Sequence, residues 1–185
     1  MSRENVEVVR DGAAGRDALD RLVVLAPALV CLFGRGSRQA PVGSSVRRRL
    51  VSFGIERAFA AMARSDVEVV RLFYEPDAEV WMRSMAGVGL EECYRGHDGV
   101  RALYADVDEA WGRWSWTVRA VVDGGDRYAI RTEFLGYGRT SGARTVVMDG
   151  GTAALLSPRG LVTWQEWFVE RDGWYKALEA VGLSE

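Results

Sequence analysis

The chain has 185 residues, of which 48% are hydrophobic and 27% charged, and its formal net charge is −2. This balance is typical of one globular domain that buries a core without metal or disulfide support. One histidine and two cysteines exclude a multi-histidine metal site and a disulfide scaffold, and the near-neutral charge gives no overall attraction to nucleic acid.

The first 56 residues show little regular periodicity. Residues 2–10 predict the start of a helix, with Ser2 as its cap. Residues 35–49 are rich in glycine, serine and arginine, which predicts a mobile, exposed loop. Between residues 35 and 57, six arginines stand against Glu56 alone, a local charge of +5. Such a patch suits phosphate or an acidic partner, and it equally suits a solvated connector.

The longest apolar run, residues 22–33, contains Pro27 and has 12 residues. A bilayer-spanning helix needs roughly 20 apolar residues, so this run is too short to cross a membrane. The segment before it lacks the positive charge of a signal peptide. We therefore expect a cytoplasmic protein without a membrane partner.

Helical spacing dominates the chain from residue 57. Phe59 and Met62 share an apolar face, and a capping box at residues 65–68 begins a second helix. A short strand is expected over residues 77–83. A third helix follows Gly96, because residues 100, 103, 104, 107 and 111 are apolar at helical spacing.

The period then changes from helical to two. Strands are predicted over residues 114–122, 127–135, 144–156 and 161–169, separated by short turns. Such short turns join antiparallel strands, because parallel neighbours need long crossovers. A final helix is expected to stop at Gly182. Helices followed by an antiparallel meander predict an α+β domain, a cone whose mouth can hold a small ligand.

Four phrases resemble a known family: MSRENVEVVR at the start, AFAAMARSDVEVVRLFYEPDAEVWM at 58–82, YRGHDGVRALY at 94–104 and ALEAVGL at 177–183. They are similar to SnoaL-like proteins of the nuclear transport factor 2-like superfamily. The resemblance implies a cone with a strongly bent antiparallel sheet, N-terminal helices on its concave face, a pocket for a small apolar molecule and a homodimer. The family includes polyketide cyclases and is similar to ketosteroid isomerases and epoxide hydrolases.

The resemblance also suggests how the chain is divided. Residues 1–10 would start the first helix and residues 57–183 would form the cone domain. Residues 11–56 stand between them as an atypical, partly disordered insertion, either genuine or the product of an altered reading frame.

Two positions depart from the family pattern. Relatives carry Trp-His where this chain has Trp81-Met82, so one proton carrier is missing. Gly150 and Gly151 replace side chains of the third strand, which predicts a wider pocket or a bulge.

Two carboxylates are candidate catalytic groups. Asp149 has no charged neighbour within four residues, and strict alternation places it on one face with Val147 and Ala153. Glu166 has the aromatic neighbours Trp164 and Phe168 on its face. A carboxylate on an apolar face has a raised pKa and can act as general acid or base. The alternative for Asp149 is a solvent-facing sheet edge, and for Glu166 a surface or dimer interface.

His97 is a third, weaker catalytic candidate, because imidazole titrates near neutral pH. It lies at a helix start, where capping or surface packing is the alternative. Aromatic side chains of the expected cone supply candidate ligand-binding residues. They are Tyr74, Trp81, Trp116, Phe134 and Trp164.

Two functions stay open at this point. One is a binding module for a small apolar ligand, favoured by Met82 in place of histidine. The other is a cofactor-independent isomerase or cyclase that moves a proton next to a carbonyl of a polyketide- or steroid-like substrate. Neither requires a metal or cofactor, and no nucleotide-binding motif is present.

Overall fold

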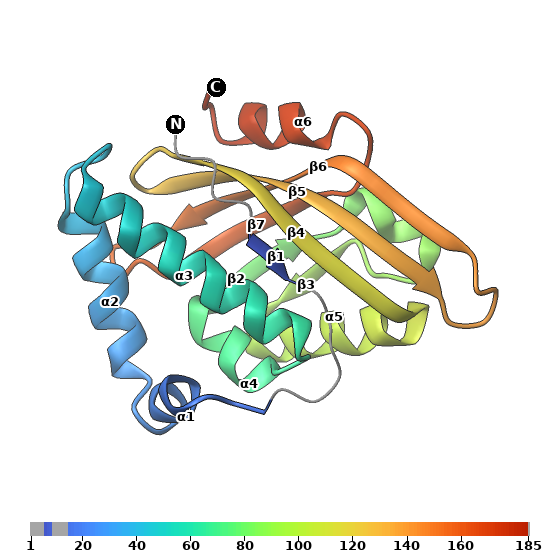
Figure 1. The fold of residues 1–185 in the computed structure, drawn as a ribbon, viewed down its shortest axis with the longest axis horizontal. Coiled ribbons are helices and arrows are strands. Elements are labelled where there is room, and N and C mark those ends of the chain that lie inside the picture. Colours follow the sequence, from blue (N-terminus) through green and yellow to red (C-terminus); the bar gives the residue numbers. More distant parts are fainter. Residues whose placement is uncertain (1–5, 9–14, 185) are drawn as a thin grey trace.

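The computed structural model describes residues 6–8 and 15–184 (Figure 1). Its helices are α1 (Ala18–Leu25), α2 (Ala28–Gln39), α3 (Ser45–Ala63), α4 (Val67–Val70), α5 (Gly96–Ala110) and α6 (Gly173–Ala180), with 3₁₀ turns η1 (Arg71–Phe73) and η2 (Arg83–Val88). Its strands are β1 (Val6–Val8), β2 (Tyr74–Trp81), β3 (Cys93–Arg95), β4 (Trp111–Asp123), β5 (Arg127–Gly138), β6 (Arg144–Leu156) and β7 (Val162–Phe168). Among these residues, no helix is both long and apolar enough to cross a bilayer.

The strands form one curved sheet in the order β1-β4-β5-β6-β7-β2-β3. The four long strands β4 to β7 are an antiparallel meander, which confirms the prediction from their short turns. One pairing differs, because β2 lies parallel to β7. The chain between these two strands includes α5 and the strands β4 to β6, which is enough for a crossover between parallel neighbours.

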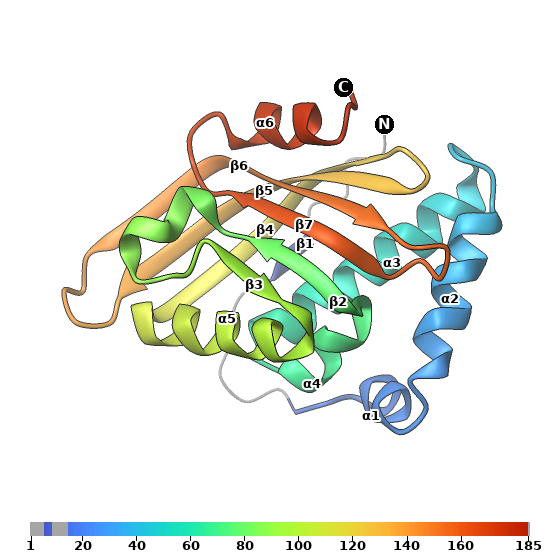
Figure 2. The same ribbon diagram turned by 180° about the vertical axis from the view of Figure 1, so that it is seen from behind.

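The concave face of the sheet is covered by α3, α4 and α5 (Figures 1 and 2). Phe59 of α3 lies 6.0 Å, ring centre to ring centre, from Trp167 of β7. Trp116 of β4 contacts both Trp167 and Phe134 of β5, at 4.7 and 4.6 Å. Each such aromatic side chain removes about 150–250 Å² from water, so these rings dominate the core. The predicted α+β cone, with helices on its concave face, is confirmed.

The opposite face of the sheet is covered in part by α6 (Figure 1). A side chain at Gly151 would place its Cβ 2.7 Å from the Cβ of Ala177 in α6. Glycine is therefore required there for close helix packing, and not for a wider pocket. The register of β5 and β6 shifts between Thr132 and Phe134, which confirms the predicted bulge beside Gly150.

The N-terminal region differs from the sequence-based expectation. Val6–Val8 form a strand on the edge of β4, where a helix was expected, and the remainder of residues 2–10 lies outside the described residues. The loop predicted over 35–49 is also wrong, because α2 continues to Gln39 and α3 begins at Ser45.

Specific packing explains why residues 35–49 are helical. The side chain of Arg47 is 1% exposed and bonds Asp123 at the β4–β5 turn, with Nε–Oδ2 and Nη2–Oδ1 distances of 2.5 and 2.8 Å. Its guanidinium also donates to the backbone oxygens of Ser37 and Gly125, at 2.6 Å each. Gly34 allows α2 to touch the turn after β6, since a Cβ there would lie 2.5 Å from the oxygen of Arg159. Gly34 and Ser37, two of the small residues around the predicted loop, are buried positions of a packed helix.

Candidate functional site

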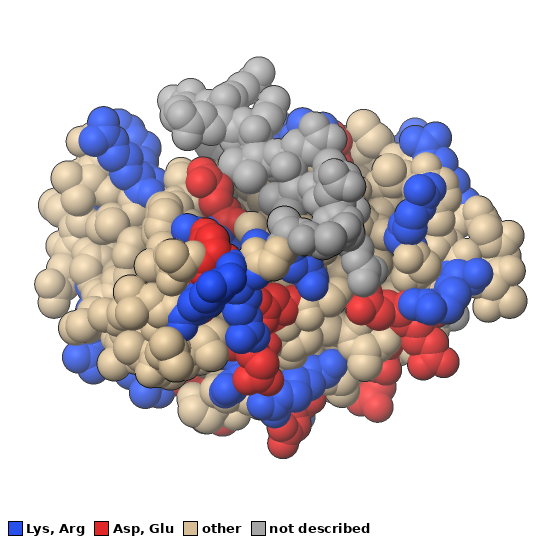
Figure 3. Space-filling model, turned by 60° about the horizontal axis from the view of Figure 1, so that its bottom comes forward, with Lys and Arg blue, Asp and Glu red and all other residues tan. Residues whose placement is uncertain are grey.

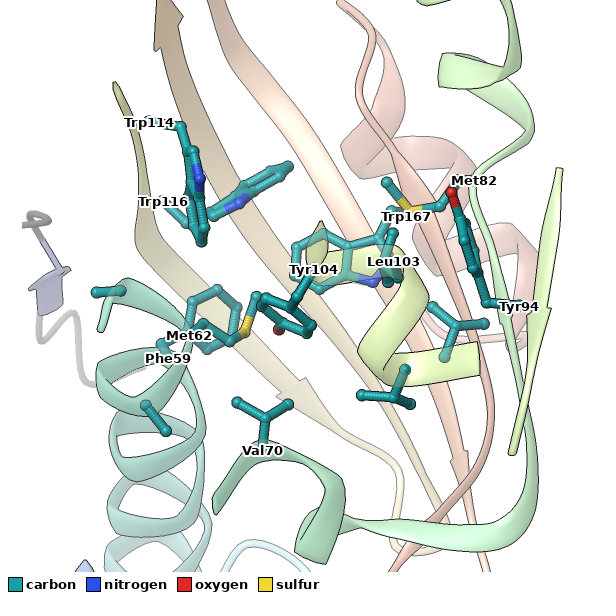
Figure 4. Packing of buried hydrophobic residues seen from close by; sticks show 14 of the residues in the cluster. Phe59, Met62, Val70, Met82, Tyr94, Leu103, Tyr104, Trp114, Trp116 and Trp167 are labelled. Carbon is teal, nitrogen blue, oxygen red and sulfur yellow. The ribbon is translucent and has the colours of Figure 1, made fainter. Parts of the chain in front are cut away.

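A small cavity lies between the concave face of the sheet and the helices (Figure 4). Its volume of about 20 Å³ is enough for one water molecule. The lining is apolar and aromatic, and none of the described residues in it is charged. The lining residues are Met62, Met82, Leu103, Tyr104, Val107, Trp114, Trp116 and Trp167.

Two carboxylates of α5 organise polar groups near this cavity. Asp108 accepts a hydrogen bond from Nε1 of the lining residue Trp114 at 2.9 Å, and another from the Ser65 hydroxyl at 3.1 Å. Asp106 accepts one from the Tyr94 hydroxyl at 2.6 Å. Burial raises the pKa of Tyr94, and the bond to Asp106 raises it further, so the phenol stays protonated.

Sequence reasoning missed Asp106 and Asp108. A signal for them exists, because both lie toward the C-terminal end of a helix, where negative charge opposes the helix dipole. Carboxylates in that position indicate partners from outside the helix.

Asp149 lies away from the cavity. Its side chain is 43% exposed and forms an ion pair with Arg131 of β5, with an Nε–Oδ1 distance of 3.0 Å. The bulge in β6 breaks the alternation on which the predicted shared face rested. Val147 packs with the concave core, whereas Ala153 packs against α6 on the opposite face. The expected common face of these residues is therefore wrong.

Glu166 is buried, as its aromatic neighbours suggested, but on the outer face of the sheet. It pairs with Ala153, which packs against α6, while its neighbour Trp167 lines the cavity on the concave side. Nη1 of Arg83 lies 2.8 Å from both carboxylate oxygens of Glu166. The same guanidinium lies 4.0 Å from the ring centre of Trp81. A carboxylate held this way cannot reach a molecule on the concave side.

His97 serves a structural contact. Its Nε2 lies 3.1 Å from the backbone oxygen of Tyr74, which joins the start of α5 to the start of β2. The ring is half-buried and is not part of the cavity lining. This geometry supports the packing alternative considered for His97.

The five candidate ligand-binding aromatics separate into three groups. Trp116 lines the cavity and Phe134 packs directly on it. Tyr74 is buried, where its hydroxyl donates to Gln165 and burial raises its pKa. Trp81 pairs with Glu166 across β2 and β7, and Trp164, two residues before Glu166, packs with the cluster beneath α6 on the outer face. A ligand role for Trp116 and Phe134 stays a prediction that the geometry allows.

Comparison with known proteins agrees with this architecture. The model of the SnoaL-like domain family matches residues 55–156, more than half of the chain. The chain therefore belongs to the SnoaL-like family. No curated protein matches it.

Solved structures show the same fold at low identity. TerC, crystallised with polyporic acid, is 20% identical with a TM-score of 0.57, over 69% of this chain and 97% of TerC. A SnoaL-like polyketide cyclase assigned in Jannaschia sp. CCS1 is 19% identical with a TM-score of 0.56, over 70% of this chain and 90% of that one. An NTF2-like protein of unknown function from Burkholderia pseudomallei is 16% identical with a TM-score of 0.59, over 69% and 94%. The chain is thus a SnoaL-like protein with an NTF2-like fold.

Proposed function

We propose that this protein binds a small, flat, apolar molecule in the concave cavity and does not use Asp149, Glu166 or His97 for proton transfer. The observation that carries the proposal is the lining itself, three tryptophans, a tyrosine and two methionines with no charged member among the described residues. Tryptophan faces suit flat rings, because offset stacking adds to apolar burial.

The two methionines explain how a cavity of about 20 Å³ can admit a ligand. Met62 on α3 and Met82 after β2 contribute unbranched side chains with three rotatable bonds, which repack at low cost. Met82 occupies the position where similar SnoaL-like proteins carry a histidine. The cavity therefore has a flexible apolar side chain at a position where those proteins have a group that can transfer a proton. TerC and a ketosteroid isomerase-like protein from Catenulispora acidiphila were solved with polyporic acid and trimethylamine, respectively. Small organic ligands in two proteins of this fold support the proposal.

Proton transfer requires a base within about 2.6–3.2 Å of the proton it removes. Asp149 and Glu166 are ion-paired away from the cavity, and His97 contacts backbone. The alternative function, a cofactor-independent isomerase or cyclase, would have to use Asp106 or Asp108 instead.

Binding can be tested with 2-naphthol as a flat aromatic probe in isothermal titration calorimetry. Met82→Phe fills the cavity with a rigid ring and is expected to weaken binding at least tenfold. Met148→Phe is the matched control, because Met148 is exposed on β6 and its replacement should leave the dissociation constant unchanged. Equal weakening by both variants, or equal binding by Met82→Phe and wild type, would contradict the assignment of the cavity.

The enzyme alternative is tested by the same protein with Asp106→Asn and Asp108→Asn. If turnover of any polyketide- or steroid-like ketone is found and either variant abolishes it while 2-naphthol still binds, the protein is an enzyme and the binding-only proposal fails.

A further inference from the structure

The exposed apolar side chains of this protein are concentrated on its N-terminal helices. Of the eleven large hydrophobic residues that are exposed in the described part of the chain, seven lie between residues 22 and 53. They are Leu22, Leu25, Leu29, Leu32, Val42, Val46 and Phe53. Leu25 is 84% exposed and Leu32 is 61% exposed, so these side chains contribute little to the core. An exposed cluster of this kind indicates an interaction surface.

Helical spacing places these residues on adjoining faces. On α2, Leu29 and Leu32 are three residues apart and follow Leu25 at the end of α1. On α3, Val46 and Phe53 are seven residues apart and share a face. We call this surface the N-terminal apolar face, made of Leu25, Leu29, Leu32, Val46 and Phe53.

The two helices are joined at their outer sides. The rings of Phe33 in α2 and Phe53 in α3 lie 5.6 Å apart, so the two helices contact each other beside the exposed Phe53. The whole unit is held on the domain by Arg47 and by Arg38, which donates to the backbone oxygen of Ser157 at 2.7 Å. The face is therefore presented in a fixed orientation.

Basic side chains border this face. Arg21, Arg35, Arg48 and Arg49 are exposed and form no ion pair with another described residue. The other arginines of residues 15–57 are held by Asp66, Asp17, Asp20, Asp123 or backbone oxygens. In the same segment Glu56 is the one carboxylate without a described ion-pair partner. Arg38 bonds only backbone oxygens, so five arginines and one carboxylate without ion pairs leave an uncompensated charge of +4. Figure 3 shows a broad uncharged area on the left, where α1, α2 and α3 lie, with basic side chains at its upper and lower margins.

We propose that the N-terminal apolar face docks on the surface of an anionic phospholipid membrane. Leucine and phenylalanine side chains flanked by arginines match an interface in which apolar groups enter the acyl boundary and cations meet anionic headgroups. The sequence predicted no membrane partner because no segment is long enough to span a bilayer. A peripheral contact needs no spanning segment, and the fold brings together residues that are dispersed in the sequence.

Charge argues against a second copy of the chain as the occupant. A twofold interface sets the same patch of both subunits face to face, so the arginines of one copy would oppose those of the other. Anionic headgroups supply the complementary charge.

Vesicle co-sedimentation tests the proposal with the full chain. Vesicles of phosphatidylcholine with 30 mol% phosphatidylserine are compared with pure phosphatidylcholine, at low and high salt. Wild type should sediment with the anionic vesicles and be released by salt. The triple variant Arg35→Gln/Arg48→Gln/Arg49→Gln should have a partition coefficient about one hundred-fold lower than wild type. This estimate multiplies a factor of about five for each of the three arginines near the membrane surface.

Controls separate this face from general charge and hydrophobicity. Arg144→Gln/Arg171→Gln removes two exposed arginines elsewhere and should leave partitioning almost unchanged. Leu25→Ser/Leu29→Ser/Leu32→Ser should abolish it, whereas Val146→Ser/Met148→Ser on the sheet should not. Failure of wild type to bind anionic vesicles overturns the proposal. It is also overturned if light scattering shows a dimer that only the leucine variant converts to monomer, because the face then joins two copies.

Discussion

Replacing Arg47 by methionine should detach α2 and α3 from the sheet. Arg47 connects three parts of the chain: α3, which carries it, the end of α2 through Ser37, and the β4–β5 turn through Asp123 and Gly125. Methionine keeps much of the apolar stem and removes the guanidinium. The bonds to Asp123 also hold the pKa of Arg47 above its usual value, so the guanidinium stays charged at any working pH.

The size of the effect follows from what is left behind. Three backbone oxygens, those of Ser37, Ala40 and Gly125, lose their donor, at about 1–3 kcal/mol for an acceptor that is buried. Breaking a buried ion pair by removing one partner costs about 3–5 kcal/mol in total, because a charge stays buried and unpaired. Asp123 is 17% exposed and regains some contact with water, so its own penalty is reduced. We therefore expect the free energy of unfolding to fall by about 3–5 kcal/mol, a large part of the 5–15 kcal/mol of a typical domain.

Urea unfolding followed by circular dichroism measures this loss. Arg48→Met is the matched control, since Arg48 is the adjacent exposed arginine of the same helix, and its effect should stay within about 0.5 kcal/mol. Adding Asp123→Asn to Arg47→Met should cost less than the sum of the single changes, because the two side chains interact. Equal effects of Arg47→Met and Arg48→Met would refute the role of Arg47. Trypsin provides a second measurement, since cleavage between Arg35 and Arg49 should accelerate in Arg47→Met alone.

Two further predictions concern packing and pH. Gly34→Ala should lower the free energy of unfolding by about 1–3 kcal/mol, because the added Cβ would meet backbone atoms. Gly36→Ala, in the same helix with no atom within 4 Å of the added Cβ, should raise it by about 0.5–1 kcal/mol. A thermal unfolding experiment in which both melting temperatures move the same way would contradict this prediction. The side-chain bonds from Arg16 lower the pKa of Asp66 below 3.8, so this stabilisation is complete above that pH and is lost as pH falls through the folded-state value. Arg16→Gln should therefore reduce the slope of the unfolding free energy plotted against pH on the acid side. An unchanged slope between pH 5 and pH 2 would contradict the role of the Arg16–Asp66 pair.

The sequence predicted the elements that have strong local periodicity. The four meander strands and α5 lie where alternation and helical spacing placed them, and Gly182, with φ of +63°, ends the last helix region. These signals are local, because each residue's face depends only on its neighbours along the chain. The parallel pairing of β2 with β7 is not local, and nothing in either strand specifies it.

The error at residues 35–49 has a different physical origin. Gly34 is small because the backbone of residues 159–160 approaches it, and the buried Ser37 donates to the oxygen of Gly34 at 2.8 Å within the helix. Composition is the same for a mobile loop and for a helix packed at close range. Arg47 would have distinguished the two, but its partner Asp123 lies 76 residues away.

The candidate site was harder to predict, because a carboxylate with no charged neighbour along the chain can still have an arginine close to it in the fold. Asp149 and Glu166 were chosen since no opposite charge lies close to them along the chain, yet Arg131 and Arg83, 18 and 83 residues away, neutralise them in the fold. A single bulge was enough to break the alternation around Asp149. The concave cavity instead collects aromatic and methionine side chains from separate elements, among them Trp116, which was predicted from the sequence as a ligand-binding residue. This apolar surface supports the proposal of binding, because the two carboxylates chosen from the sequence, Asp149 and Glu166, are ion-paired away from it.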